Sequence, residues 1–357
     1  MRPARWPRDG HERLLCVDPA AGSFFDEGLG RLPALLRPGD LVVVNDAATL
    51  PASLRGRTPG GAPLELRLLG RGEGGLFRAV AFGEGDWRTP TERRPAPPLL
   101  APGVRITFST AEPAPWPSAP LVARVERVSE LSPRLVELRF EAEGAALWRA
   151  LYAAGSPVQY SYLEGPLALW HVQTGYASRP WAAEGPSAGF ALRWRVLSAL
   201  ARRGVRLAPL THAAGLSSSG DEALDAALPL PERYDIPERT ARLVAETRRA
   251  GGRVVAVGTT VVRALEGSAA SADGAPHGGE GVTDLKLGPG SRPRVVDGLL
   301  TGLHEPGSSH FSLLEAFAPA PLVLAALEHA REAGYEGHEF GDVGLVLGGI
   351  AAEAAAA

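Results

Sequence analysis

Two histidines stand where a predicted strand gives way to a loop, which is where α/β folds tend to place reactive side chains. His212 follows the apolar run 205–210, and His304 ends the run RVVDGLLTGLH over residues 294–304. An imidazole in such a place can give or take a proton near neutral pH. An isolated histidine is more often structural, so both interpretations stay open for each of them.

Asn45 and Asp46 occupy the same kind of place, directly after the apolar run 41–44. Asx residues that follow a strand usually build a turn, and otherwise they mark a polar site at the strand end. The sequence alone is consistent with either role.

A further candidate is the start of a predicted helix within residues 251–267, GGRVVAVGTTVVRALEG. Residues 253–257 form a short β-branched run typical of a buried strand, and Gly258 permits a sharp turn. Thr259 or Thr260 is suited to be the helix N-cap. The unpaired N–H groups at such a helix start favour a phosphate, a carboxylate or a polarised oxygen, although an ordinary strand-to-helix connection has the same pattern.

The 357-residue chain has the composition of a soluble globular protein, with 45% hydrophobic and 22% charged residues. Its formal net charge of -3 gives no electrostatic footprint for nucleic acid. The single cysteine, Cys16, excludes an intrachain disulfide and a cysteine-cluster zinc site. The sequence shows no GxSxG elbow between a strand and a helix, no Walker loop, no GxGxxG that opens a βαβ unit and no HExxH, so no metal is expected. Without a signal peptide or an apolar run that could span a bilayer, we expect a cytoplasmic protein with no membrane partner.

The middle of the chain, residues 53–150, predicts an inserted all-β domain. Its short alternating strands are separated by Gly and Pro clusters and have no helices between them, which is typical of a small β-barrel or sandwich. These strands are expected at residues 63–69, 76–82, 104–108, 121–128 and 134–140.

The flanking segments alternate strands and helices and predict one α/β domain. Residues 1–52 are its first part, and residues 151–357 are the remainder, which carries the candidate binding site. Strands are expected at residues 13–18, 41–44, 205–210, 253–257, 294–304 and from 343 onward, and helices at 29–36, 192–203, 237–250, 310–317 and 322–333. Residues 268–281 are expected to form a flexible loop, and residues 351–357 a frayed tail.

Seven stretches, taken in order, resemble the S-adenosylmethionine:tRNA ribosyltransferase-isomerase family of the queuosine pathway. The strongest are VGTTVVRALEG, residues 257–267, and VVDGLLTGLHEPGSSHFSLLEAF, residues 295–317. The other stretches are residues 40–56, 172–177, 186–190, 210–216 and 340–347. No single stretch is decisive, but the ordered set spans nearly the whole chain and is specific.

This resemblance implies both a fold and a reaction. The fold is α/β, a discontinuous α/β domain with an inserted all-β barrel domain, in agreement with the change of pattern along the chain. The reaction transfers and isomerises the ribosyl portion of S-adenosylmethionine onto the aminomethyl group of a 7-deazaguanine base in tRNA. Adenine and methionine are released, S-adenosylmethionine serves as co-substrate, and no metal is required.

The family motifs also imply roles for individual residues. Gly258, Thr259 and Thr260 would hold a polar part of S-adenosylmethionine such as the methionine carboxylate, and Arg263 would reinforce it with a charge-assisted hydrogen bond. The alternative for Arg263 is a pair with Glu266 on the same helix face.

The chemistry of the reaction needs groups that move protons. The sulfonium makes the neighbouring C5′ protons acidic, so a positioned base begins the rearrangement, and a proton donor helps adenine to depart. The matched residues are Ser187, Gly189 and Glu266 for binding, and His304, His212, Glu232 and Asp297 for catalysis. His304 is the first choice for acid or base, and His212 is the second.

Several polar positions depart from the family's pattern. Gly302-Leu303-His304 stands where the family has Asn-Phe-His, and Gly307 replaces a lysine. A changed substrate or a loss of catalysis would have this effect. The acceptor is therefore either tRNA or a small molecule, and a non-catalytic homologue that binds S-adenosylmethionine is a further alternative. A monomer is expected.

Overall fold

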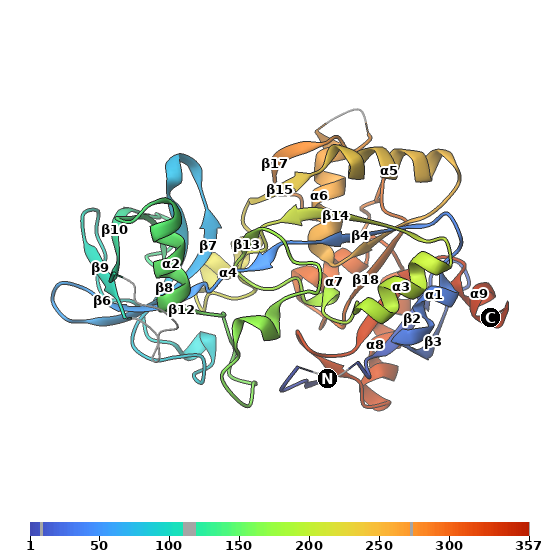
Figure 1. Cartoon of the computed structure of the whole chain (residues 1–357). Coiled ribbons are helices and arrows are strands. Elements are labelled where there is room, and N and C mark those ends of the chain that lie inside the picture. The colour runs from blue at the N-terminus through green and yellow to red at the C-terminus, as the bar shows by residue number, and fades with distance from the viewer. Residues whose placement is uncertain (8–9, 110–118, 272–273, 357) are drawn as a thin grey trace.

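The computed structural model describes residues 1–7, 10–109, 119–271 and 274–356. It contains a large mixed sheet covered by helices and, beside it, a separate antiparallel β-barrel (Figure 1). The barrel strands come from one internal segment of the chain, while the large sheet takes strands from both sides of that segment. The expected fold class, an α/β domain with an inserted all-β barrel, is confirmed.

The barrel has six strands in the order β6-β7-β8-β11-β10-β9, and pairing of β6 with β9 closes it. Their bounds are β6 (Ser53–Arg57), β7 (Pro63–Arg71), β8 (Phe77–Phe82), β9 (Arg105–Phe108), β10 (Leu121–Val128) and β11 (Leu135–Phe140). Gly56 lies at the closure, where a Cβ would come within 2.8 Å of the Thr107 carbonyl oxygen. Helix α2 (Gly144–Ala154) packs on the same apolar core, and β12 (Gly155–Ser156) pairs with β6.

The large sheet has nine strands in the order β17-β15-β14-β4-β16-β18-β20-β2-β3. Their bounds are β2 (Arg13–Asp18), β3 (Ser23–Gly28), β4 (Leu41–Asn45), β14 (Arg206–His212), β15 (Glu232–Ile236), β16 (Val254–Val257), β17 (Gly279–Thr283), β18 (Gly298–Gly302) and β20 (Val343–Leu347). The central strands β14, β4, β16 and β18 run parallel. Their carboxyl ends therefore meet at one edge of the sheet.

Helices cover both faces of this sheet (Figure 1). Side chains of α5 (Glu238–Arg249), α6 (Thr259–Ala270) and α8 (Ala320–Glu332) pack in one core, and those of α1 (Leu32–Leu35), α3 (Trp194–Arg202) and α9 (Ile350–Ala356) pack in the other. Along β4, Leu41 and Val43 face the first core, whereas Val42 and Val44 face the second. Burial on both faces explains why this strand is an unbroken apolar run.

Several smaller elements complete the described chain. They are β1 (Arg2–Pro3) paired with β19 (Glu336–Gly337), β5 (Ala48–Thr49) paired with β13 (Pro180–Ala182), α4 (Glu222–Ala227), α7 (Ser309–Leu314), and the 3-10 turns η1 (Leu29–Arg31), η2 (Glu73–Gly75), η3 (Thr91–Arg93), η4 (Leu169–Val172) and η5 (Ser187–Gly189). Among the described helices, none has both the length and the apolar character that a membrane span requires.

Four local predictions need correction. The N-cap of α6 is Gly258, with φ of 89° and no side-chain cap, so Thr259 and Thr260 belong to the first helical turn. The strand expected over residues 294–304 is only Gly298–Gly302, because the residues before it bond to side chains of other elements. The loop expected over 268–281 is shorter, because residues 268–270 end α6 and residues 279–281 begin β17; residues 272–273 lie outside the described residues.

The segment expected as a frayed tail over residues 351–357 forms helix α9 up to Ala356, and residue 357 lies outside the described residues. The Asp18 carboxylate accepts hydrogen bonds of 2.9 Å from the backbone N–H groups of Gly349 and Ala351, at the start of this helix. Glu353 reaches back to Arg37 at 2.6 Å. Contacts with distant residues therefore stabilise a segment whose own sequence gave no capping signal.

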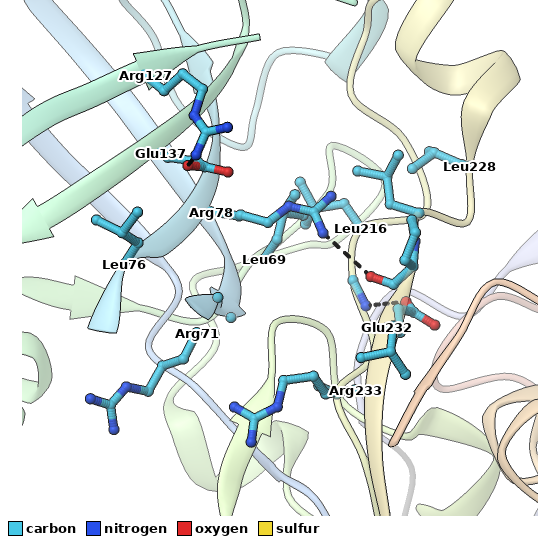
Figure 2. Close-up of a pocket in the computed structure, with 17 residues that line it drawn as sticks. Leu69, Arg71, Leu76, Arg78, Arg127, Glu137, Leu216, Leu228, Glu232 and Arg233 are labelled. Atoms are coloured by element: carbon cyan, nitrogen blue, oxygen red, sulfur yellow. Dashed lines mark hydrogen bonds and ion pairs between the residues drawn. The ribbon is translucent and has the colours of Figure 1, made fainter. Parts of the chain in front are cut away.

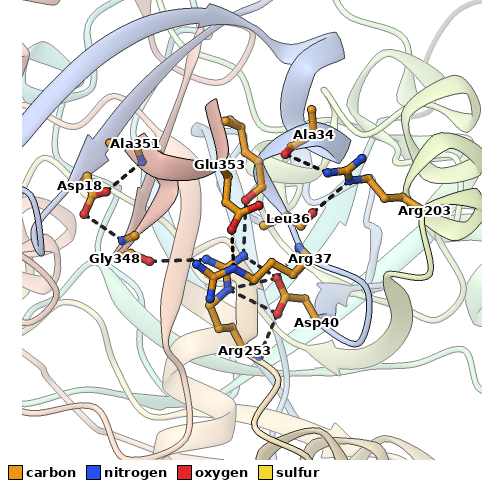
Figure 3. A network of polar contacts seen from close by, with 12 residues as sticks. Asp18, Ala34, Leu36, Arg37, Asp40, Arg203, Arg253, Gly348, Ala351 and Glu353 are labelled. Atoms are coloured by element: carbon orange, nitrogen blue, oxygen red, sulfur yellow. Dashed lines mark hydrogen bonds and ion pairs between the residues drawn. The ribbon is translucent and has the colours of Figure 1, made fainter. Parts of the chain in front are cut away.

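A buried ion pair fixes the amino ends of the central strands (Figure 3). Asp40, just before β4, lies 2.6 Å from Nη2 of Arg253, just before β16. The same carboxylate accepts backbone N–H bonds from Arg37 at 2.8 Å and from Arg253 at 2.9 Å. Asp40 is 1% exposed, so its charge depends on these partners.

We predict that Asp40→Asn lowers the free energy of unfolding by about 3 kcal/mol, because it leaves the Arg253 guanidinium buried without its counter-charge. Urea unfolding followed by far-UV circular dichroism measures the change. The matched control is Glu353→Gln, which breaks the more exposed pair with Arg37 and should cost at most about 1 kcal/mol. Equal losses in the two variants would contradict the role assigned to Asp40.

Candidate active site at the carboxyl edge of the sheet

The carboxamide of Asn45 joins three elements at the carboxyl edge of the sheet. Its Oδ1 accepts the backbone N–H of His212 at 2.9 Å and that of Ala47 at 3.0 Å. Its Nδ2 donates to the His212 carbonyl at 3.1 Å and to the Thr260 hydroxyl at 3.3 Å. Asn45 therefore both builds the turn after β4 and holds the ends of β14 and α6 together.

A buried polar cluster lies next to this junction. Glu232 at the start of β15 forms an ion pair with Arg263 of α6, and its Oε1 accepts the Gly215 backbone N–H at 2.7 Å. Nε2 of His212, at the end of β14, lies 3.6 Å from Oε2 of Glu232. The structure thus brings together three residues that are far apart in the sequence and that the family motifs singled out.

Burial controls the charge state of this cluster. The His212 ring is fully buried, and neither of its nitrogens has a hydrogen-bond partner among the described residues. Burial, together with the Arg263 charge, lowers the pKa of His212 to about 3, so the imidazole is neutral at pH 7. Burial raises the pKa of Glu232, and the neighbouring Arg263 opposes that shift.

A pair of stacked imidazoles also lies near the carboxyl edge, close enough to Arg263 for its charge to act on His310. His304 follows β18, and its ring stacks on His310 of α7 with centroids 4.7 Å apart. Nε2 of His304 lies 2.8 Å from the Thr301 hydroxyl. Burial and the neighbouring His310 lower the pKa of His304 to about 3, and burial together with Arg263 lowers that of His310. Both rings are therefore uncharged at neutral pH.

The predicted small-residue loop lies against the start of α6. A Cβ added to Gly258 would be 3.5 Å from the Cβ of Ala188, in the turn η5 that contains Ser187 and Gly189. A Cβ on Gly189 would come within 2.3 Å of the Tyr176 hydroxyl, so this position has no room for a side chain. Thr259 and Thr260, in the first turn of α6, therefore lie beside this loop.

Two predicted site residues lie at the opposite end of the sheet. Oδ2 of Asp297 accepts the Val254 backbone N–H at 2.8 Å, where β16 begins. Glu266 is buried and accepts backbone N–H groups of residues 294–296 at 2.9 Å. Arg263 pairs with Glu232 instead, so the helix pair of Arg263 with Glu266 does not form. The structure places Asp297 and Glu266 away from the histidines.

A cavity of about 630 Å³ lies between the barrel and this edge of the sheet (Figure 2). Glu232, Gly215 and Arg233 belong to its wall on the sheet side. On the barrel side it is lined by Leu69, Arg71, Leu76, Arg78, Arg127 and Glu137. Through Glu232, the buried cluster of His212 and Arg263 adjoins a space large enough for a small-molecule or nucleotide ligand.

Known proteins with similar sequences cover almost the whole chain. The profile of the family described as "Queuosine biosynthesis protein" matches residues 2–346. The chain belongs to this family. The resemblance of the sequence motifs to this family is therefore confirmed.

Two relatives and one solved structure illustrate the similarity. The S-adenosylmethionine:tRNA ribosyltransferase-isomerase of Gloeobacter violaceus is 38% identical and covers 97% of this chain and 92% of its own. That of Rubrobacter xylanophilus is 36% identical, with 98% and 94% covered. The crystal structure of the S-adenosylmethionine tRNA ribosyltransferase of Thermotoga maritima has a TM-score of 0.50 at 24% identity, with 97% and 96% covered, and shows the shared fold.

Sequence reasoning about this queuosine biosynthesis family member did not single out His310 or Thr301 as partners of His304. Both lie within the matched stretch 295–317, on either side of His304, and this position in the motif could have pointed to them. No group of three or more His, Cys, Asp or Glu side chains suited to a metal ion occurs in the described part of the chain.

We predict that His212→Gln weakens the pH dependence of stability. The folded pKa of about 3 lies below the ordinary 6.5, so the unfolded chain binds an extra proton below pH 6.5 and native stability falls as the pH falls. Between pH 7.5 and pH 5.5, this one group should lower the free energy of unfolding by about 1.4 kcal/mol. Urea unfolding of both proteins at the two pH values measures the difference; an unchanged pH dependence in the variant would contradict a buried neutral His212.

Proposed function

We propose that this family member is an S-adenosylmethionine:tRNA ribosyltransferase-isomerase. It transfers and isomerises the ribosyl portion of S-adenosylmethionine onto 7-aminomethyl-7-deazaguanine in tRNA and releases adenine and methionine. The observation that carries the proposal is the buried cluster of His212, Glu232 and Arg263 beside the cavity. The names of relatives that match nearly the whole chain support the same reaction.

In this proposal the start of α6 binds the methionine end of S-adenosylmethionine. Unpaired N–H groups and the helix dipole favour a carboxylate beside Thr259 and Thr260. Ser187 and Gly189 form the adjoining wall. Arg263 is engaged with Glu232 and, through Nε, with the Leu285 carbonyl at 3.1 Å, so its role is to hold Glu232 in place.

Neutral imidazoles suit a cationic substrate. A protonated histidine would repel the sulfonium, whereas His304 and His212, whose pKa values are lowered to about 3, remain uncharged at pH 7. His304 takes the C5′ proton, with the Thr301 hydroxyl holding its ring. Burial raises the pKa of Glu232 against the opposing charge of Arg263, so Glu232 can bind a proton that enters through the cavity and pass it to the departing adenine, with His212 beside it.

We expect a monomer as the active unit. A tRNA substrate places the protein in the cytoplasm. The barrel and the sheet together leave a cavity at the site, so the acceptor nucleotide has a route to Glu232.

The decisive experiment incubates the purified protein with S-adenosylmethionine, with and without tRNA that carries 7-aminomethyl-7-deazaguanine. Mass spectrometry follows adenine and methionine. Release of both that requires the modified base is the expected result. If adenine is absent under both conditions while S-adenosylmethionine still raises the melting temperature, the protein binds this ligand without the proposed chemistry, and the proposal is wrong.

We predict that His304→Ala lowers turnover at least about a hundredfold, because the reaction loses its proton acceptor. Calorimetry should find the affinity for S-adenosylmethionine unchanged within a few fold. The control is His329→Ala on α8, where the imidazole pairs with Asp26 at 2.7 Å near the far edge of the sheet. Normal turnover of His304→Ala would exclude this residue from catalysis.

A further inference from the structure

The cavity contains a guanidinium that lacks an acidic partner. Arg78 of β8 is half-buried, and Figure 2 shows its side chain crossing from the barrel toward the loop before β15. Its hydrogen bond there is a long one, 3.4 Å to the Pro231 carbonyl, and no ion pair of Arg78 occurs among the described residues. Burial lowers the pKa of Arg78, opposed by the more distant charges of Glu137 and Glu232. A cation in such a setting is stabilised by an incoming anion.

The other arginines of the cavity divide into two kinds. Arg127 pairs with Glu137 at 2.8 Å, and Arg233 pairs with Glu280 at 2.7 Å. Arg71, at the end of β7, is exposed, lies over the Phe77 ring and has no ion pair among the residues that the structure describes. Arg71 and Arg78 are thus two uncompensated positive charges on one β-hairpin of the barrel.

We propose that Arg71 and Arg78 form a phosphate-binding subsite that holds the RNA backbone beside the acceptor nucleotide. This inference rests on the proposed function and adds the group that recognises the polynucleotide. The planar guanidinium matches the phosphate oxygens with paired, charge-assisted hydrogen bonds. S-adenosylmethionine carries no phosphate, so the acceptor is the substrate that supplies one.

The position of the subsite favours RNA over a free nucleotide. Arg78 lies half-buried inside the cavity that Glu232 lines, whereas Arg71 is exposed at its rim (Figure 2). When a nucleotide is inserted toward Glu232, the phosphates before and after it would reach the half-buried Arg78 and the exposed Arg71. A mononucleotide has only one phosphate group and could engage one of them.

The test measures binding of a fluorescently labelled anticodon stem–loop RNA to the full chain by anisotropy at several salt concentrations. Arg78→Gln and Arg71→Gln should each weaken binding about tenfold at low salt, the loss of one charge-assisted contact. The slope of log affinity against log salt concentration should become shallower by about 1 in each variant, as expected when one phosphate contact is lost. Affinity for S-adenosylmethionine, measured by calorimetry, should stay within twofold.

The matched control is Arg105→Gln, which removes an exposed barrel arginine that pairs with Glu141 outside the cavity. Its RNA affinity should stay within twofold of the unchanged protein. RNA binding that is unaffected in both cavity variants would overturn the subsite, as would a matching loss of S-adenosylmethionine binding. Binding of a nucleoside monophosphate without binding of the RNA would also overturn it. Adenine release is measured separately, so failure of the reaction is distinguishable from failure of the subsite.

Discussion

The hydrogen bonds of one buried carboxamide determine where the candidate site lies. A buried amide is stable only when its donors and acceptor are satisfied, and Asn45 meets this requirement by bonding to β14, to the turn after β4 and to α6. These partners are the segments that deliver His212 and Arg263. The parallel strands bring the segments to one edge, and the amide fixes their relative positions.

The electrostatics of the site follow from this packing. Arg263 and Glu232 are held as a buried pair, and burial together with the Arg263 charge keeps His212 and His310 neutral. Each imidazole consequently keeps a lone pair available at neutral pH without adding positive charge. The cost of burying these groups in a folded chain is offset by the extensive apolar cores on both faces of the sheet.

The sequence predicted the fold class and most central elements, because unbroken apolar runs such as that of β4 and alternating runs such as those of the barrel follow from burial. It missed the edge strands β3 and β17 and the neighbouring strand β15. Their polar sequences, SFFDEG, GEGVT and ERYDI, form strands because they pair with neighbours. The motifs did single out His212, Glu232 and Arg263, which the structure brings together. They did not reveal the Arg263–Glu232 pairing or the distant places of Asp297 and Glu266, since these depend on contacts between remote segments.

The cavity has one wall on the barrel and the other on the edge of the large sheet. The chain enters the barrel through β6 and leaves it through α2 and β12, so one continuous segment supplies an entire wall. If the cavity holds the acceptor, as we propose, substitutions in that segment alter which acceptor fits while the buried cluster of the sheet stays intact. In the proposed arrangement, the choice of acceptor and the bond-making chemistry therefore depend on different segments of the chain and can change independently.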